Sequence, residues 1–239
     1  LNTNEVLRHQ ALSPDIAPAG SFLQDLQVSV DGGTIVIADA SFWRKSPAII
    51  VYDVETGEAR RVLESHASVS AENYMIRSQE RDMEFLGGIA ALRGGVDGIA
   101  LDHEWLYFGA LSGSSLFRVK LSDLRDKKLP PGQLANRVER YSDKPLSDGL
   151  SIDLEGNIYI TDVEHNSVFV VGESRELKTL VRSPDIRWPD ALSFGPGGYL
   201  YIADSALPEL ILQSREHIDA NGPYRIFRFR PGFDGVPGQ

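Results

Sequence analysis

The stretch SDGLSIDLEGNIYITD at residues 147–162 decides the fold of this chain. It contains an aspartate, a short apolar run, a turn with glycine and acidic residues, and a second run rich in β-branched and aromatic residues. Related stretches occur at residues 24–39, 96–109 and 189–204. In three of the four copies a second aspartate stands 14 positions after the first. This self-similarity predicts a repeat architecture built from β-strands.

More apolar runs follow each copy of this stretch. A third run stands at residues 48–53, 115–119, 167–171 and 224–229, and three copies have a fourth at residues 59–63, 138–141 and 177–181. Four antiparallel strands in a unit of about 40 to 50 residues are typical of a β-propeller blade. We therefore predict an all-β fold, a β-propeller of four-stranded blades, of which four are visible in the sequence.

Six such blades would need roughly 270 residues. We expect residues 1–239 to form a single, incomplete propeller domain, with the outer strand of an earlier blade at residues 6–11 followed by four blades. On this reading the N-terminal part of the ring is missing. The long interval between the first two repeats holds an insertion at residues 66–95, which is an extra hairpin, a loop over one face, or a connection without function.

The composition narrows the class of partner. Acidic residues number 34 and basic residues 24, for a net charge of −10, and the basic residues form no cluster. This disfavours nucleic acid and favours a cationic or neutral small molecule. The absence of cysteine excludes disulfides, thiolate catalysis and cysteine-bound zinc. No apolar run is long enough for a membrane span, the first residues lack signal-peptide features, and the oligomeric state is left open.

The repeat aspartates fall into two sets. In a propeller the first strand of each blade lines the central channel and the second runs back, so both sets lie at one mouth. The inner set comprises Asp25, Asp97, Asp148 and Asp190. The outer set comprises Asp39, Asp162 and Asp204. We expect the outer carboxylates to cap turns. The inner carboxylates either bind a ligand or are structural. Because they converge in a narrow channel, their charge must be neutralised by a cation, by raised pKa values or by hydrogen bonds from backbone N–H groups.

Several of these motifs resemble the major royal jelly protein/yellow family in its bacterial branch. They are GVDGIAL at 95–101, LSDGLSID at 146–153, YITDVEHN at 159–166 and WPDALSFG at 188–195. The resemblance covers residues 21–230 and extends to the gluconolactonase/senescence-marker group. It implies a six-bladed propeller and an extracellular or periplasmic location.

The resemblance also implies a metal site. In the gluconolactonase group a divalent ion near one end of the channel is held by Glu, Asn and Asp from different blades. Asp148 matches the Asp ligand, which is also that group's proposed general base, and Asp97 falls where the group has its Asn ligand. Gln24 falls near a substrate-contacting Asn, and the Glu ligand would come from a blade outside this chain. Oxygen ligands of this kind suit Ca²⁺ best, with Mg²⁺, Mn²⁺ or Zn²⁺ as alternatives.

Other side chains are candidates for contact with a substrate. Asp25 and Asp190 belong to the inner ring, and His165 is either a proton carrier at the mouth or a plain hairpin tip. Trp188 and the pair at 42–43 either wall a ring-shaped ligand or pack between blades. Residues 195–198 read as a hairpin turn, and the serines at 112–115 lack the spacing of a nucleophile elbow.

Two classes of function remain open. The first is a metal-dependent hydrolase of a lactone or ester, in which Asp148 activates water; the yellow branch suggests instead a dopachrome-type tautomerase. The second is a propeller that binds a small molecule without turnover, because one fold hosts many functions.

Overall fold

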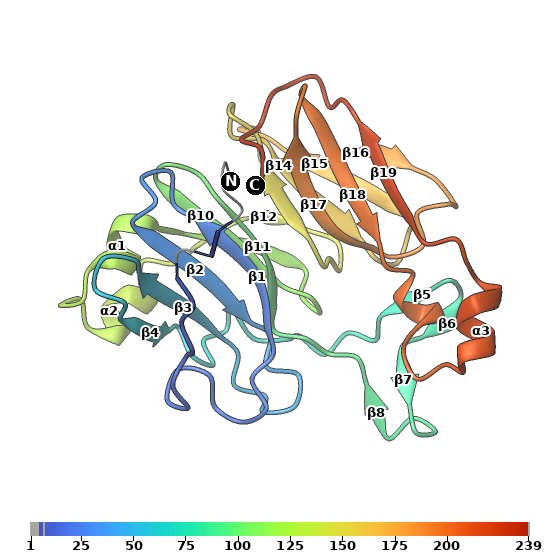
Figure 1. Cartoon of the computed structure of the whole chain (residues 1–239), viewed down its shortest axis with the longest axis horizontal. Coiled ribbons are helices and arrows are strands. Elements are labelled where there is room, and N and C mark those ends of the chain that lie inside the picture. The colour runs from blue at the N-terminus through green and yellow to red at the C-terminus, as the bar shows by residue number, and fades with distance from the viewer. Residues whose placement is uncertain (1–4, 7, 239) are drawn as a thin grey trace.

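The chain folds into four β-sheets arranged side by side as the blades of a β-propeller (Figure 1). The computed structural model describes residues 5, 6 and 8–238. In this part of the chain, three of these blade sheets have four strands and the last has three, and two further sheets of two strands each lie outside the blades. Neighbouring strands within each blade are antiparallel. The fold is therefore all-β in its core, as the repeats predict.

Each predicted run overlaps one strand. The first blade contains β1 (Leu23–Val28), β2 (Thr34–Asp39), β3 (Ala48–Asp53) and β4 (Ala59–Val62). The second contains β9 (Val96–Leu101), β10 (Trp105–Ala110), β11 (Ser115–Lys120) and β12 (Glu139–Asp143). The third contains β13 (Leu150–Ile152), β14 (Ile158–Asp162), β15 (Ser167–Val171) and β16 (Leu177–Arg182). The fourth contains β17 (Pro189–Gly195), β18 (Tyr199–Asp204) and β19 (Arg225–Phe229).

The core lies between consecutive blades. One apolar cluster joins the first two blades and includes Ile49 and Phe108. Another joins the second and third blades, and a third joins the last two, with Tyr159 against Phe194. All five residues of β14 are buried. A strand with no solvent-facing side has to be apolar on both faces, which accounts for its continuous apolar run.

The inner strands approach one another closely at glycines. A Cβ on Gly98 would lie 2.3 Å from the carbonyl oxygen of Asp148, and a Cβ on Gly149 would lie 2.5 Å from that of Asp190. Glycine is the residue that allows such contact between backbones. The Asp-Gly pairs of the second and third blades therefore seat each blade against the next one.

The insertion at residues 66–95 forms small hairpins that cover one face. They are built from β5 (Arg77–Ser78), β6 (Arg81–Asp82), β7 (Glu84–Phe85) and β8 (Ala90–Ala91). Ile76 and Met83 pack in a buried cluster with Leu146 and Trp188. In Figure 1 the hairpins lie beside α3 (Arg215–Ala220), and Arg81 donates a hydrogen bond to the carbonyl oxygen of Pro208 in η1 (Leu207–Glu209). The insertion is thus a structured cover and not a bare connection.

Other connections complete the structure. Two short helices, α1 (Leu121–Arg125) and α2 (Pro131–Ala135), link β11 to β12. The C-terminal segment returns to the third blade, where Gly235 forms an antiparallel bridge with Asp153. No helix in the described part of the chain is long and apolar enough to cross a membrane.

The outer strand predicted at residues 6–11 is not formed. Residue 7 lies outside the described residues, and the others of this segment have no strand structure. The side chain of Arg8 donates to the carbonyl oxygen of Val54, so the segment contacts the β3–β4 turn by a side chain instead of a backbone ladder.

Candidate functional site

The four inner aspartates meet at the centre of the four blades. Asp97 lies in β9 and is 2% exposed, and Asp148 stands just before β13 and is 9% exposed. Asp25 in β1 and Asp190 in β17 are close enough that each raises the pKa of Asp97 and Asp148 by charge repulsion, after the larger effect of burial. The repeat therefore concentrates acidic groups where water is excluded.

Burial makes the charged forms of these acids unfavourable. It raises the pKa of Asp97 and Asp148 well above their ordinary value, with mutual repulsion adding to the effect. Burial also raises the pKa of Asp190, and it raises that of Asp25 to about 7 although the N–H of Ile99 donates to the Asp25 carboxylate. Because burial and repulsion disfavour the ionised carboxylates, a cation bound near the cluster would stabilise their charged form.

The two central aspartates differ in their partners. Trp188 Nε1 donates a hydrogen bond of 2.6 Å to Asp148 Oδ2. Asp97 Oδ2 is buried and has no hydrogen-bond partner among the described residues. Since a buried carboxylate oxygen without a partner is costly, Asp97 presents an acceptor that a ligand could satisfy.

The outer aspartates hold turns, as predicted. Asp39 accepts hydrogen bonds from the backbone N–H groups of Phe22 and Ser41, and also from Arg61 Nη1 at 2.8 Å. Asp204 accepts from the N–H groups of Arg187 and Trp188 and from Arg187 Nε.

Asp162 follows the same plan in the third blade. It accepts from the N–H groups of Glu164 and His165, and its Oδ2 lies 3.0 Å from Nδ1 of His165. The His165 side chain is 61% exposed at the tip between β14 and β15. This position fits the hairpin-tip reading and leaves the imidazole in contact with the outer acid.

Of the aromatic candidates, Phe42 packs against the buried cluster that contains Trp188, whereas Trp43 is exposed. Trp188 has no exposed surface and packs in the cluster below the insertion, so it reaches the site only through its N–H on Asp148. Phe42 packs edge-on against Phe22, and Trp43 is 81% exposed. Gln24 is half-buried in β1, next to Asp25. The structure therefore shows no aromatic wall built by Trp188 and Trp43 together.

The pattern of repeats does not reveal Lys144. This side chain is 4% exposed, and its Nζ donates to Ser147 Oγ and to the carbonyl oxygen of Pro145, each at 2.9 Å. Burial lowers the pKa of Lys144 to about 7, while attraction to Glu72, Asp97, Asp162 and Asp148 opposes the change. Lys144 stands between strands in an ordinary connecting segment, so only its place in space identifies it.

The residues present fit part of a metal site. Asp97 and Asp148 offer carboxylate oxygens, the donors that Ca²⁺ prefers, and Asp97 Oδ2 is unpartnered. Within residues 5, 6 and 8–238, however, no group of three or more His, Cys, Asp or Glu side chains is arranged to hold an ion.

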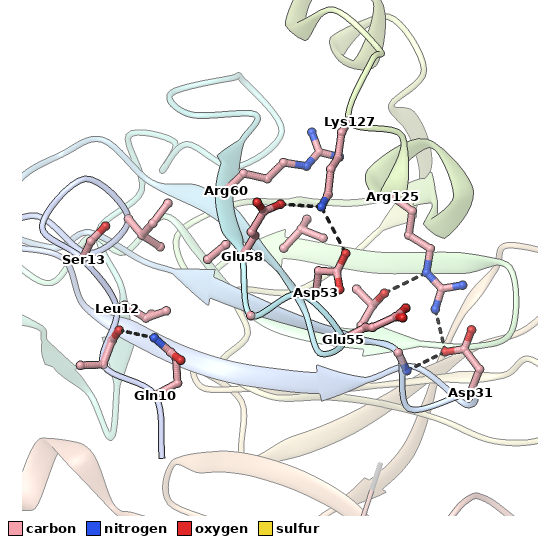
Figure 2. A pocket seen from close by; sticks show the side chains of 17 residues that line it. Gln10, Leu12, Ser13, Asp31, Asp53, Glu55, Glu58, Arg60, Arg125 and Lys127 are labelled. Atoms are coloured by element: carbon pink, nitrogen blue, oxygen red, sulfur yellow. Dashed lines mark hydrogen bonds and ion pairs between the residues drawn. The ribbon is translucent and has the colours of Figure 1, made fainter. Parts of the chain in front are cut away.

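A separate cavity of about 690 Å³ lies at the rim of the first blade (Figure 2). It contains none of the predicted site residues. Arg125 pairs with Asp31 at 2.7 Å, and Lys127 bridges Glu58 at 2.7 Å and Asp53 at 3.2 Å. These pairs join the turns of the first blade to the segment that contains α1, so the charges of the cavity serve packing between blades.

Comparison with known proteins gives both a family and a fold. The family model described as major royal jelly protein matches residues 1–227. No curated protein sequence matches the chain.

Solved structures share the propeller at low identity. Regucalcin from Agrobacterium tumefaciens, described as a calcium-binding protein, is 16% identical with a TM-score of 0.60, over 92% of this chain and 64% of that one. A luciferin-regenerating enzyme is 13% identical with a TM-score of 0.61 over the same shares. A gluconolactonase from Xanthomonas campestris is 15% identical with a TM-score of 0.51, over 78% of this chain and 56% of that one. The chain thus spans less than two thirds of these structures.

Proposed function

The chain belongs to the major royal jelly protein family, and on that premise we propose that its acidic channel mouth binds and hydrolyses a small lactone or ester with the help of a divalent cation. The observation that carries the proposal is the unpartnered Asp97 Oδ2, buried beside Asp148 in the acidic cluster. The fold of regucalcin and of the gluconolactonase supports it, since the printed descriptions of those proteins name calcium binding and lactonase activity.

Asp97 and Asp148 would hold the ion, with Ca²⁺ preferred for an all-oxygen donor set. When bound, the ion would polarise the substrate carbonyl. The remaining ligands would come from other oxygen donors such as water or the substrate, because the described residues contain no group of three or more His, Cys, Asp or Glu side chains arranged to hold an ion.

Asp148 is the proposed general base. Its carboxylate takes a proton from water, the water oxygen attacks the carbonyl carbon, and the bond to the leaving oxygen breaks as that oxygen regains the proton. A base works best when its pKa approaches the working pH, and burial raises the pKa of Asp148 in that direction. Trp188 keeps Oδ2 in one orientation through its 2.6 Å hydrogen bond. Asp25, Asp190, Gln24 and His165 are the proposed contacts of the substrate.

One observation favours a second function, binding without turnover. Asp97 and Asp148 are almost completely buried, and Trp188, which donates to Asp148, has no exposed surface. A buried site with two acidic ligands suits retention of a small cationic molecule better than rapid exchange of substrate and product. A tautomerase of the dopachrome type would require a proton carrier, for which His165 is the candidate.

The decisive experiment is calorimetric titration with CaCl₂ together with assays on simple lactones, for the wild type, Asp97→Asn and Asp148→Asn. The hydrolase proposal expects Ca²⁺ binding that both variants weaken, and activity that Asp148→Asn abolishes. Asp185→Asn, on an exposed carboxylate, serves as the control. Binding of a small cationic molecule with no turnover of any lactone would favour the second function, and lactonase activity unaffected by Asp148→Asn would remove the mechanism.

We also propose that these blades belong to a six-bladed ring and that residues 1–239 form one propeller domain. The inner strand of the first blade supports this, because Leu26, Val28 and the adjacent Val30 are 56%, 41% and 54% exposed. Apolar side chains on an inner strand normally pack against a neighbouring blade. An experimental structure of the full-length protein tests the proposal, because the number of blades can be counted in it. Six blades in one ring are expected.

A further inference from the structure

The channel has a second end, opposite the mouth that contains the aspartates. The inner strands β1, β13 and β17 all begin close to an aspartate of the mouth, so their last residues lie on the other side of the molecule. These last residues are Val28, Ile152 and Gly195. We call this side the far end of the channel.

Residues 231–238 are bound to the third blade at the far end. Gly235 forms an antiparallel bridge with Asp153, the residue that follows β13. The N–H group of Leu154 donates a hydrogen bond of 2.9 Å to the carbonyl oxygen of Asp234. The segment therefore satisfies backbone groups of the inner strand's exit.

The same segment reaches two further blades. The N–H group of Gly238 donates to the carbonyl oxygen of Phe194, one residue before β17 ends, at 2.8 Å. A cavity of about 360 Å³ lies between the segment and the exit of β1, and the residues that line it include Val28, Val30, Val236 and Pro237. The segment thus lies at the far ends of the first, third and fourth blades.

The order of the blades shows that the segment crosses the middle of the molecule. Apolar clusters join consecutive blades from the first to the fourth. A segment that contacts the fourth and third blades and faces the first therefore passes over the centre. In Figure 1 it is drawn in red and arches from β19 back to the middle of the view.

Two glycines allow the segment to lie this close to the blades. A Cβ on Gly235 would lie 2.2 Å from Cδ2 of Phe194, a ring that is 2% exposed. A Cβ on Gly198, in the turn between β17 and β18, would lie 2.4 Å from Oδ1 of Asp234. Since only glycine permits such approaches, a side chain at either position would push the segment outward.

We propose that residues 231–238 are a plug that closes the far end of the channel, so that water and ligands reach the aspartates through the mouth. A closed end excludes water from the space beneath the acidic cluster, and electrostatic interactions are stronger where water is excluded. The plug acts in this way whether or not the mouth binds a metal ion or hydrolyses a lactone.

Hydrogen exchange measured by NMR tests whether the segment is held as a plug. Gly235→Ala places a methyl group against a buried ring and is expected to release the segment, so the Leu154 amide should exchange at least about tenfold faster than in the wild type. The Thr161 amide, which is bonded within the third blade, should keep its rate. Gly132→Ala is the control, because nothing lies within 4 Å of that Cβ position. Unchanged exchange at Leu154 would overturn the proposal.

Trp188 reports how easily small molecules reach the aspartates. Its indole N–H donates to Asp148, and its side chain has no exposed surface. The chain has three tryptophans, so Trp43→Phe together with Trp105→Phe leaves Trp188 as the single fluorophore. Quenching of its fluorescence by acrylamide then measures access to the acidic cluster.

This quenching is compared in three chains of the single-tryptophan background: the unchanged segment, Gly235→Ala, and a chain shortened after Arg230. The shortened chain adds no side chain to the interior, so it tests the plug where Gly235→Ala does not yield folded protein. Urea unfolding measured in parallel establishes that each chain is folded. We expect stronger quenching when the segment is released or removed. Equal quenching in folded chains with and without the segment would overturn its role in closing the channel.

Discussion

Trp188 Nε1 donates a 2.6 Å hydrogen bond to Asp148 Oδ2, and both side chains are buried. Asp148 precedes the inner strand of the third blade and Trp188 that of the fourth, so the bond ties two blades together at the mouth. It also stabilises the ionised carboxylate and lowers the pKa of Asp148 against the larger, opposite effect of burial. One contact thus serves both the assembly of the blades and the proposed base.

Replacing Trp188 by phenylalanine is expected to keep most of the packing and remove this bond. Asp148 would lose its donor in a buried place, at a cost of about 1.5–3 kcal/mol in the free energy of unfolding. Urea unfolding near neutral pH measures the loss. Trp43→Phe is the matched control, because Trp43 is 81% exposed, and it should change stability little. Equal stability of the two variants would contradict a structural role for the bond.

Gly149 is expected to tolerate no side chain. A Cβ there would lie 2.5 Å from the carbonyl oxygen of Asp190, and backbone cannot move aside as a flexible side chain can. We predict that Gly149→Ala costs about 1–3 kcal/mol or more in the free energy of unfolding. Gly132→Ala is the control, since Gly132 lies in the short helix α2 with nothing within 4 Å of its Cβ position. A Gly149→Ala protein as stable as the control would show that the blades can separate at this point.

The repeated stretches around the aspartates predict the strand pairs well, because each pair of strands and the turn between them are neighbours in the sequence. Two apolar runs on either side of a Gly-rich turn, as at 189–195 and 199–204, predict both a strand and its partner. The roles of Asp39 and Asp204 followed from the same local chemistry, since a carboxylate at the end of a strand accepts the N–H groups of the next turn.

The rest of the site depends on contacts that the sequence does not display. The buried position of Lys144 depends on Gly109 in another strand, because a Cβ there would lie 2.5 Å from Lys144 Cε. Trp188 was a candidate for a ligand wall, but the packing of the insertion around it removes its exposed surface. The burial of both side chains depends on how the insertion and the blades pack together. The periodic pattern of the sequence does not predict this packing.

The buried ion pair of Asp39 and Arg61 is expected to be worth far more than an exposed one. The carboxylate is fully buried and the guanidinium 8% exposed, with 2.8 Å between Oδ2 and Nη1. Asp39→Asn removes the buried counter-charge of Arg61 and leaves it only the partly exposed carboxylate of Glu64, 3.3 Å from Nε, which should cost about 3 kcal/mol. The exposed pair of Arg215 and Asp219 is the control, where Asp219→Asn should cost less than about 0.5 kcal/mol. Urea unfolding of both variants compares them, and similar losses would contradict the assignment of Asp39 as a turn-holding residue.

The raised pKa of Asp25 predicts how the free energy of unfolding changes with pH. Its pKa is about 7 in the folded protein and 3.8 when unperturbed, so between these values the folded state binds more protons than the unfolded state. The free energy of unfolding therefore falls as the pH rises from about 4 to about 7. Asp97, Asp148 and Asp190 act in the same direction, because their pKa values are raised as well.

Asp25→Asn removes one of these titrations. We expect the decline in the free energy of unfolding between about pH 4 and about pH 7 to be smaller in the variant by up to about 4 kcal/mol, the upper bound set by the pKa difference. Urea unfolding at a series of pH values measures it. Gln24→Asn, at the neighbouring position of the same strand, removes no titrating group and should follow the wild type. A variant that loses stability with pH as steeply as the wild type would place Asp25 in contact with solvent and outside the acidic cluster.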